Sequence, residues 1–267
     1  MRRLTAVLAA ALAATSLLPA SALAESALAD SALADSALAD STRSRESAAA
    51  TGASAKTAGG KATKGKTTKG KATSGKATFY RLRSEGGNCS YPSPPAGDLY
   101  VALSPAEYRA ARACGGYLTV TGPKGSVRVK VVDQCPECPA GHIDLSRKAF
   151  ARVADPGEGM VGVTYSPAAN PKLGKPLSFR VKEGSSQWWL ALLVIDHGNP
   201  LASVEVKTAG GAWRKLARAD YNYWITESGA GRGPFAVRVT DTRGHRVTTN
   251  GVRLAPATVQ RTTTKMY

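Results

Sequence analysis

The spacing of turn residues is the feature that most limits how this chain can fold. In its last third, turn residues recur every eight to twelve positions, as at Gly198-Asn199-Pro200, Gly210-Gly211 and Thr242-Arg243-Gly244. The stretches between these turns are rich in apolar, β-branched and aromatic residues, which is typical of short strands. The pattern predicts an antiparallel β-sandwich over residues 173–256, followed by a loose tail over 257–267.

The preceding region also reads as short strands, interrupted by two helices. Ser104 followed by Pro105, with Glu107 three residues beyond Ser104, predicts a helix that runs to residue 113. Ser146 predicts the cap of a second helix over 147–153. We expect a compact β barrel over 77–166, joined to the sandwich by a proline-containing linker at 167–172. Its clearest strands fall at 77–80, 99–103, 117–120, 127–132 and 161–165.

The segment 131–146, VVDQCPECPAGHIDLS, places two carboxylates close together in the sequence. Arg128 and Lys130 alternate with valines just before it, which predicts a strand with one buried face that ends at Asp133. If Asp133 and Asp144 faced one cleft, they would match the acid pair of a glycoside hydrolase. Alternatively, Asp133 caps a turn and only Asp144 meets a substrate. The residues alone leave both interpretations open.

The N-terminal third is predicted to lie outside any fold. Arg2-Arg3, an apolar stretch over 4–18 and Ala22-Leu23-Ala24 are typical of a secretory signal peptide over 1–24. Residues 25–76 contain three Ser-Ala-Leu-Ala-Asp repeats and a Gly/Ala/Ser/Thr/Lys-rich stretch, a composition too poor in apolar side chains to form a core. We therefore expect a disordered linker there and a protein that is secreted to the extracellular space.

The cysteines favour disulfides over a metal site. An even number of cysteines in an exported chain indicates two disulfides, and three pairings are open. The Cys-x-x-Cys spacing also suits zinc, but a second such pair is missing and the three histidines are scattered in the sequence. We expect no metal and no cofactor, and favour the pairs Cys89–Cys114 and Cys135–Cys138.

The charge of the chain points to acidic partners. The formal net charge is +17, of which the signal peptide carries +2 and residues 25–77 carry +4, leaving +11 on residues 78–267. An exported basic protein meets polyanions of cell walls, such as pectin or peptidoglycan, before it meets nucleic acid. Residues 78–267 lack a dense run of basic residues at helical spacing, so we expect no nucleic-acid partner. We expect a monomer.

The predicted sandwich contains four tryptophans, and each side chain could lie either on the surface or in the core. Trp213 alternates with polar residues and is predicted to be core. Trp188-Trp189 is different, because neighbours in a regular strand point to opposite faces. If the Gly184-Ser185-Ser186 turn distorts the backbone, both indole rings can lie on one surface and stack on sugar rings. Tyr221-Asn222-Tyr223-Trp224 leaves the same two alternatives open.

Several motifs in a fixed order resemble those of bacterial expansins. They are Thr78-Phe79-Tyr80, Asp133-x-Cys135-Pro136-x-Cys138, His142-Ile143-Asp144-Leu145-Ser146, Lys182-Glu183-Gly184-Ser185-Ser186-x-Trp188-Trp189 and Asp220-Tyr221-Asn222. The resemblance covers residues 77–256. It implies a six-stranded double-psi β-barrel followed by an immunoglobulin-like carbohydrate-binding module of the family-63 type.

The resemblance also implies roles for individual residues. Asp144 matches the groove acid on which wall loosening depends, and its implied groove neighbours are Thr78, Tyr80 and Asp133. The implied cellulose platform is Trp188, Trp189 and Tyr221, with Lys182 as a basic contact beside it. Where some bacterial members have a groove tyrosine, this chain has Cys135, so a stacking contact there is missing or comes from another residue.

The barrel also resembles family-45 endoglucanases, whose catalytic base is an aspartate on the first strand. Residues 77–81 read ATFYR, and no acid precedes Glu85 in that region. The sequence therefore predicts cellulose binding and wall loosening without hydrolysis, by a protein that is not an enzyme. The alternatives are a weak endoglucanase, a peptidoglycan lytic transglycosylase, which needs only one acid, and a pure carbohydrate-binding protein.

Overall fold

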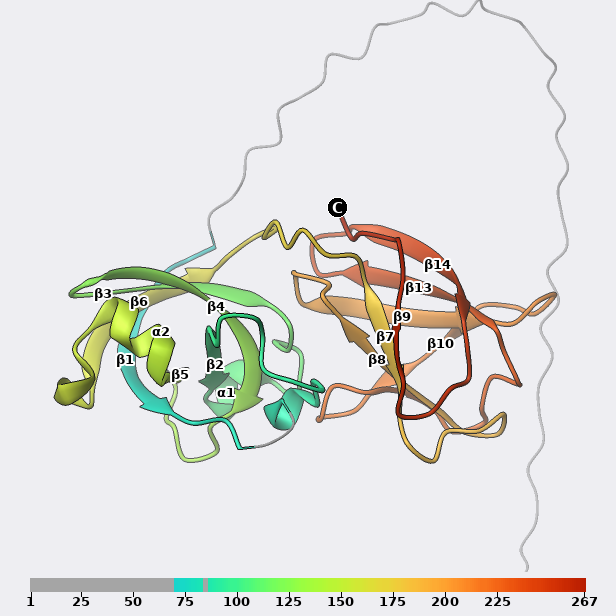
Figure 1. The fold of residues 1–267 in the computed structure, drawn as a ribbon, viewed down its shortest axis with the longest axis horizontal. Coiled ribbons are helices and arrows are strands. Elements are labelled where there is room, and N and C mark those ends of the chain that lie inside the picture. Colours follow the sequence, from blue (N-terminus) through green and yellow to red (C-terminus); the bar gives the residue numbers. More distant parts are fainter. Residues whose placement is uncertain (1–69, 84–85) are drawn as a thin grey trace, which may run out of the picture. The chain divides into compact units, whose positions relative to one another are not determined.

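The computed structural model describes residues 70–83 and 86–267, which form a closed barrel followed by a two-sheet sandwich (Figure 1). This arrangement confirms the predicted mainly β fold class. The predicted signal peptide and most of the predicted linker, residues 1–69, lie outside the described residues. No helix in the part of the chain that the structure describes is long and apolar enough to cross a membrane.

The barrel closes through six strands in the order β1-β5-β2-β4-β3-β6. β1 runs parallel to β5 and β2 runs parallel to β4, while the other neighbouring strands are antiparallel. The strands are β1 (Thr73–Tyr80), β2 (Tyr100–Leu103), β3 (Tyr117–Gly122), β4 (Gly125–Gln134), β5 (His142–Ser146) and β6 (Val161–Pro167). Parallel pairing matters for the site, because it places β1 and β5 side chains at matching heights.

The first strand begins earlier than the sequence predicts. β1 starts at Thr73, within the segment that was expected to be disordered up to residue 76. Thr73 pairs with Tyr165 of β6, and Lys76 pairs with His142 of β5. These ladders satisfy the backbone of a Thr/Ser/Gly/Lys segment that has almost no apolar side chains of its own. Composition alone could not reveal the strand, because its partners lie far away in the sequence.

The two predicted helices differ in outcome. α2 (Arg147–Val153) has the expected cap, since the Ser146 hydroxyl accepts a 3.1 Å hydrogen bond from the Ala149 amide. α1 (Pro105–Tyr108) is much shorter than predicted. Arg109 and the two alanines after it adopt left-handed backbone angles, with φ between 48° and 63°, so the helix cannot continue to residue 113. Two 3-10 helices, η1 (Gly87–Cys89) and η2 (Pro156–Glu158), complete the barrel region.

The sandwich contains one four-stranded and one five-stranded sheet, with sheet orders β10-β9-β13-β14 and β11-β12-β8-β7-β15. Its strands are β7 (Ser178–Val181), β8 (Leu190–Ile195), β9 (Leu201–Lys207), β10 (Arg214–Lys215), β11 (Ala217–Arg218), β12 (Trp224–Thr226), β13 (Phe235–Asp241), β14 (Arg246–Val252) and β15 (Val259–Arg261).

The predicted loose tail over 257–267 is wrong. β15 lies within it and pairs with β7, extending the five-stranded sheet. The Leu177 amide donates to the Thr264 carbonyl at 2.8 Å, and Met266 is buried in the sandwich core. Polar side chains made this segment read as a tail, whereas edge-strand pairing and one buried methionine hold it in place.

Two further expectations about burial fail. Trp213 is only half-buried, and the Arg238 guanidinium lies 4.1 Å from the centroid of its ring, so it is not core. Lys130 was expected on the exposed face of its strand, yet its side chain is only 6% exposed. Its ammonium lies 3.9 Å from the centroid of the Tyr91 ring, because loops from outside the barrel cover this part of β4.

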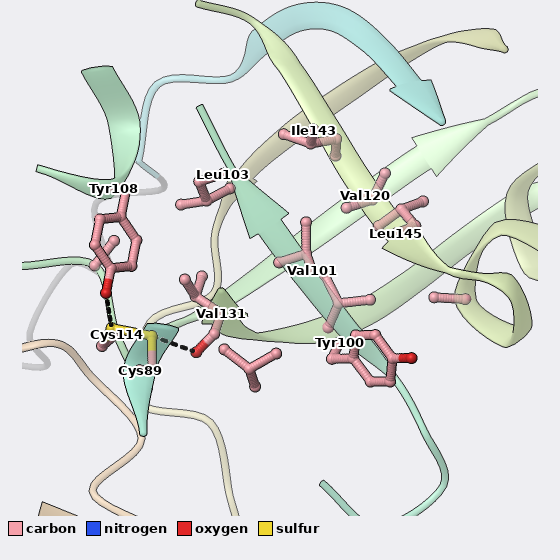
Figure 2. Packing of buried hydrophobic residues seen from close by; sticks show 14 of the residues in the cluster. Cys89, Tyr100, Val101, Leu103, Tyr108, Cys114, Val120, Val131, Ile143 and Leu145 are labelled. Atoms are coloured by element: carbon pink, nitrogen blue, oxygen red, sulfur yellow. Dashed lines mark hydrogen bonds between the residues drawn. A yellow bond between two sulfur atoms is a disulfide. The ribbon is translucent and has the colours of Figure 1, made fainter. Parts of the chain in front are cut away.

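The barrel core is apolar and is closed at one side by a disulfide. Figure 2 shows Val101 of β2, Val131 of β4 and Leu145 of β5 among the buried side chains, with the Cys89–Cys114 bond nearby. The second disulfide joins Cys135 to Cys138. Both bonds follow the pairing that we favoured from the sequence, and neither cysteine pair leaves a free thiol.

Candidate functional site

Asp144 lies on β5 directly opposite Thr78 of the parallel strand β1. The Thr78 hydroxyl donates to Asp144 Oδ1 at 2.8 Å, and His142 Nε2 lies 3.0 Å from the same hydroxyl oxygen. Because the one hydroxyl proton goes to the carboxylate, His142 Nε2–H is the donor in the second contact. The three side chains therefore form a chain of hydrogen bonds that ends on the carboxylate.

This carboxylate has a perturbed acidity. Burial raises the pKa of Asp144, while the hydrogen bond from Thr78 and the nearby His142 partly oppose that shift. Burial disfavours the charged form because the protein replaces water around it, and a donor hydrogen bond favours that form. Asp144 therefore remains protonated to a higher pH than an exposed aspartate, which favours a role as the donor of a proton or a hydrogen bond.

Asp133 at the end of β4 is in a different environment. Its Oδ1 accepts the amide of Asn88 at 2.7 Å and that of Gln134 at 2.9 Å, and Tyr80 donates to Oδ2 at 3.4 Å. Gly87 makes the approach possible, because a Cβ there would lie 2.6 Å from the Asp133 carboxyl carbon. Asp133 thus fastens the loop that carries η1 to the barrel.

The two aspartates belong to one face of the barrel but to different strands. Ala102 of β2 pairs with Asp133 on one side and with Asp144 on the other. Their backbones are therefore two strand spacings apart, about 10 Å. Ala102 also packs against Tyr80 and the Cys135–Cys138 disulfide in a small cluster. The disulfide thus supports the tyrosine ring whose hydroxyl reaches Asp133.

A cavity of about 850 Å³ opens beside these residues. Tyr80 and Asp133 line it from the barrel, and Lys182 and Tyr223 line it from the sandwich. Thr78 and Asp144 are half-buried and are not among its lining residues. Most of the other lining residues were not among the predicted site residues, and these include Arg81, Arg83, Arg180 and Tyr223. Only Tyr223 carried a signal, as part of the aromatic run after Asp220.

The charge around this cavity is positive. Arg81, Arg83, Arg180 and Lys182 outnumber Asp133 and Glu183, and Arg180 forms an ion pair with Glu183. Burial, with Asp133 as the next cause, raises the pKa of Tyr80, so its phenol stays neutral and donates. Within the described residues, no group of three or more His, Cys, Asp or Glu side chains is arranged to hold a metal ion.

The predicted aromatic platform lies on the sandwich. Trp188 is 73% exposed, whereas Trp189 and Tyr221 are half-buried and pack against a buried cluster that includes Ala191 and Tyr223 of the sandwich. The two tryptophans sit in a tight turn just before β8, in which the Ser186 amide donates to the Trp189 carbonyl at 2.7 Å. The backbone is therefore not a regular strand there, and such a distortion is what would allow both indole rings to lie on one surface.

Hydrogen bonds connect the segment that carries Tyr221 with the loop that carries η1. Ser90 Oγ donates to the Tyr221 carbonyl at 2.8 Å, and Asn222 Nδ2 donates to the Cys89 carbonyl at 3.1 Å. Tyr108 donates its hydroxyl toward the Asp220 carbonyl at 2.9 Å. The loop that carries η1 thus binds both the Asp133 carboxylate and the segment that carries Tyr221. The position of Tyr221 is therefore linked to that of Asp133.

Two family models match this chain. Residues 100–165 match a model described as "Lytic transglycolase", and residues 162–253 match the "Expansin C-terminal domain". Expansin-YoaJ of Bacillus subtilis is 35% identical over 57% of this chain and 66% of its own length. Expansin-B4 of Arabidopsis thaliana is 30% identical over 61% of this chain and 73% of its own length.

Solved structures agree with these matches. An expansin of Clavibacter michiganensis without ligand is 45% identical, with a TM-score of 0.71 over 74% of this chain and 98% of that chain. A mutant of the same expansin, solved with cellohexaose, gives a TM-score of 0.70 at the same identity and coverage.

Proposed function

This chain belongs to the expansin family, and from that membership we propose that it is exported, binds cellulose and loosens polysaccharide networks of cell walls without hydrolysing them. The observation that carries the proposal is the presence of an exposed indole, Trp188, together with a half-buried acid, Asp144, whose carboxylate accepts the Thr78 hydroxyl and is not tied to a loop as Asp133 is. The sandwich docks on a glucan chain by stacking, and the barrel groove engages a neighbouring chain.

The environment of Asp133 supports a role without hydrolysis. Inverting glycosidases need a second carboxylate that is free to activate water, at a fitting distance from the acid. Asp133 already accepts two backbone amides and the Tyr80 hydroxyl, so its lone pairs are engaged in holding the groove loop. Asp144 then acts as a hydrogen-bond donor or acceptor that competes for contacts between polysaccharide chains.

A glycan-cleaving activity is the second candidate. The barrel matches a model described as "Lytic transglycolase", and burial keeps Asp144 protonated to a higher pH than usual, as a general acid requires. A lytic transglycosylase works with one acid, so the engagement of Asp133 does not exclude it. A third alternative is a protein that binds carbohydrate and does nothing more to it.

Two measurements distinguish these candidate functions. They are the creep of isolated wall strips under constant load and the release of reducing ends from the same strips. We expect creep without new reducing ends, and loss of creep with retained cellulose binding in Asp144→Asn. Asp98→Asn is the control, because Asp98 is exposed on the barrel and Asn tolerates its positive φ of 55°. Reducing ends or anhydromuropeptides that disappear in Asp144→Asn would instead establish the enzyme. Cellulose binding without creep would leave only the binding protein.

A further inference from the structure

A second, smaller cavity lies behind the loop that begins at Tyr91. Its volume is about 310 Å³, near the lower end of the range for small-molecule sites. Tyr91 and Pro92 line both this cavity and the large groove cavity, so the loop separates two basic hollows. The lining comes from the loop over 91–99, from β3 and β4, from the connection after β6 and from the end of β8. We call this hollow the junction cavity.

Lys130 is the built-in charge of the junction cavity. Its side chain is only 6% exposed, and its ammonium lies 3.8 Å from Asp196 Oδ1. That separation permits an ion pair but is too long for a hydrogen bond. The second contact of the ammonium is the Tyr91 ring, whose centroid is 3.9 Å away. Asp196 therefore compensates the buried charge only in part.

The other charges around the cavity increase this imbalance. Arg128, Lys172 and Lys175 also line it, so four basic side chains face one carboxylate. Burial, with a smaller contribution from Lys175 and against the opposing effect of Asp196, lowers the pKa of Lys130 to about 8. An anion placed among these groups would gain from four cations and would relieve the repulsion between Lys130 and Lys175.

We propose that the junction cavity binds an anionic group, a carboxylate or a phosphate, carried by a wall polymer. The buried Lys130, held against the Tyr91 ring, defines the position of the group, and the exposed Lys172 and Lys175 add positive charge at the rim. The volume suits a single sugar-sized unit rather than a long chain. This site is separate from Asp144 and from the aromatic platform. It therefore allows the protein to bind acidic chains independently of cellulose.

The site can be tested by NMR on the intact protein, with the Lys130 side-chain signal assigned through Lys130→Arg. The probes are trigalacturonate for a carboxylate, inorganic phosphate for a phosphate, and cellotriose as the neutral control. We expect saturable shifts of the Lys130 signal with one or both anions and none with cellotriose. A response to trigalacturonate alone identifies uronic-acid polymers as the source, and a response to phosphate alone identifies phosphate polymers.

Two matched double variants distinguish binding of the anion at the junction cavity from nonspecific electrostatic attraction to a basic protein. Lys172→Gln with Lys175→Gln removes two exposed charges from the cavity rim, and we expect about five-fold weaker binding of the anion. Lys215→Gln with Arg253→Gln removes two exposed charges elsewhere, and we expect a change smaller than about two-fold. Equal weakening by both pairs, an equal response to cellotriose, or no saturable Lys130 shift would overturn the proposal. Each of these failures would leave cellulose binding and wall creep unaffected.

Discussion

Removal of the Trp188 ring should weaken cellulose binding without weakening the fold. A tryptophan side chain has about 250 Å² of surface. Since Trp188 is 73% exposed, about 180 Å² of that surface is open to a ligand. If a glucan chain covers one face, about 90 Å² becomes buried, which is worth about 2 kcal/mol at ~25 cal/mol per Å². Trp188→Ala should therefore raise the dissociation constant about thirty-fold.

The assay is a depletion isotherm on microcrystalline cellulose, with the thermal midpoint of each variant measured in parallel. Trp213→Ala is the matched control, because Trp213 is also partly exposed but lies beside Arg238 and Lys207 on the four-stranded side of the sandwich. We expect Trp213→Ala to bind cellulose as the natural protein does. The Trp188 midpoint should stay unchanged, since so exposed a ring contributes little packing.

Three results would refute this reasoning. Binding by Trp188→Ala within about two-fold of the natural protein would show that the exposed face carries no stacking energy. An equal loss in Trp213→Ala would show that tryptophan content, rather than the turn before β8, determines binding. A lowered thermal midpoint in Trp188→Ala would mean that its loss of binding reflects unfolding.

Three further predictions concern acidity and stability. The Thr78 hydroxyl stabilises the Asp144 carboxylate, so Thr78→Val should move the pH profile of wall creep to higher pH. Thr78→Ser should restore the original profile, and a shift to lower pH in Thr78→Val would contradict this role of the hydroxyl. Burial lowers the pKa of His197 to about 3. Its unfolded form therefore takes up a proton first as pH falls below about 6.5, and the free energy of unfolding should drop by about 2 kcal/mol between pH 7.5 and 5. In His197→Gln, urea titrations should show that drop reduced, and an unchanged drop would exclude His197 as its source. Replacing Cys89 and Cys114 together by alanine removes a link across 25 residues and should cost about 3.5 kcal/mol of unfolding free energy; a loss below about 1 kcal/mol in the same titration would contradict the loop-closure argument.

Local signals predicted the elements whose hydrogen bonds are themselves local. The Ser146 cap forms as expected because its partner, the Ala149 amide, lies three residues away. The hairpin of β3 and β4 forms around the glycine and proline residues that the sequence places there. Both disulfides follow the favoured pairing, although the residues alone left three pairings open. The order of motifs was enough to identify the family and the fold class.

Errors arose where the local backbone conformation or a partner distant in the sequence differed from what the local pattern predicted. The chain leaves α1 after Tyr108 as Arg109 turns into a left-handed conformation, although propensity would extend the helix to 113. Thr73 and Val259 become strand residues because β6 and β7 offer free edges. Lys130 is buried because Tyr91 and Asp196 cover its face of β4. None of these partners is visible to a reading of neighbouring residues.

The sequence by itself determined which residues could form the candidate site, since Asp144, Thr78 and the tryptophan pair stand in recognisable motifs. Only the tertiary structure decided how deeply each of these side chains is buried and which hydrogen-bond partners it has. Parallel pairing of β1 with β5 brings Thr78 onto Asp144, and the η1 loop engages Asp133. Two aspartates that are equivalent in the sequence therefore differ in the fold, because burial and hydrogen-bond partners are set by strands and loops remote in the chain.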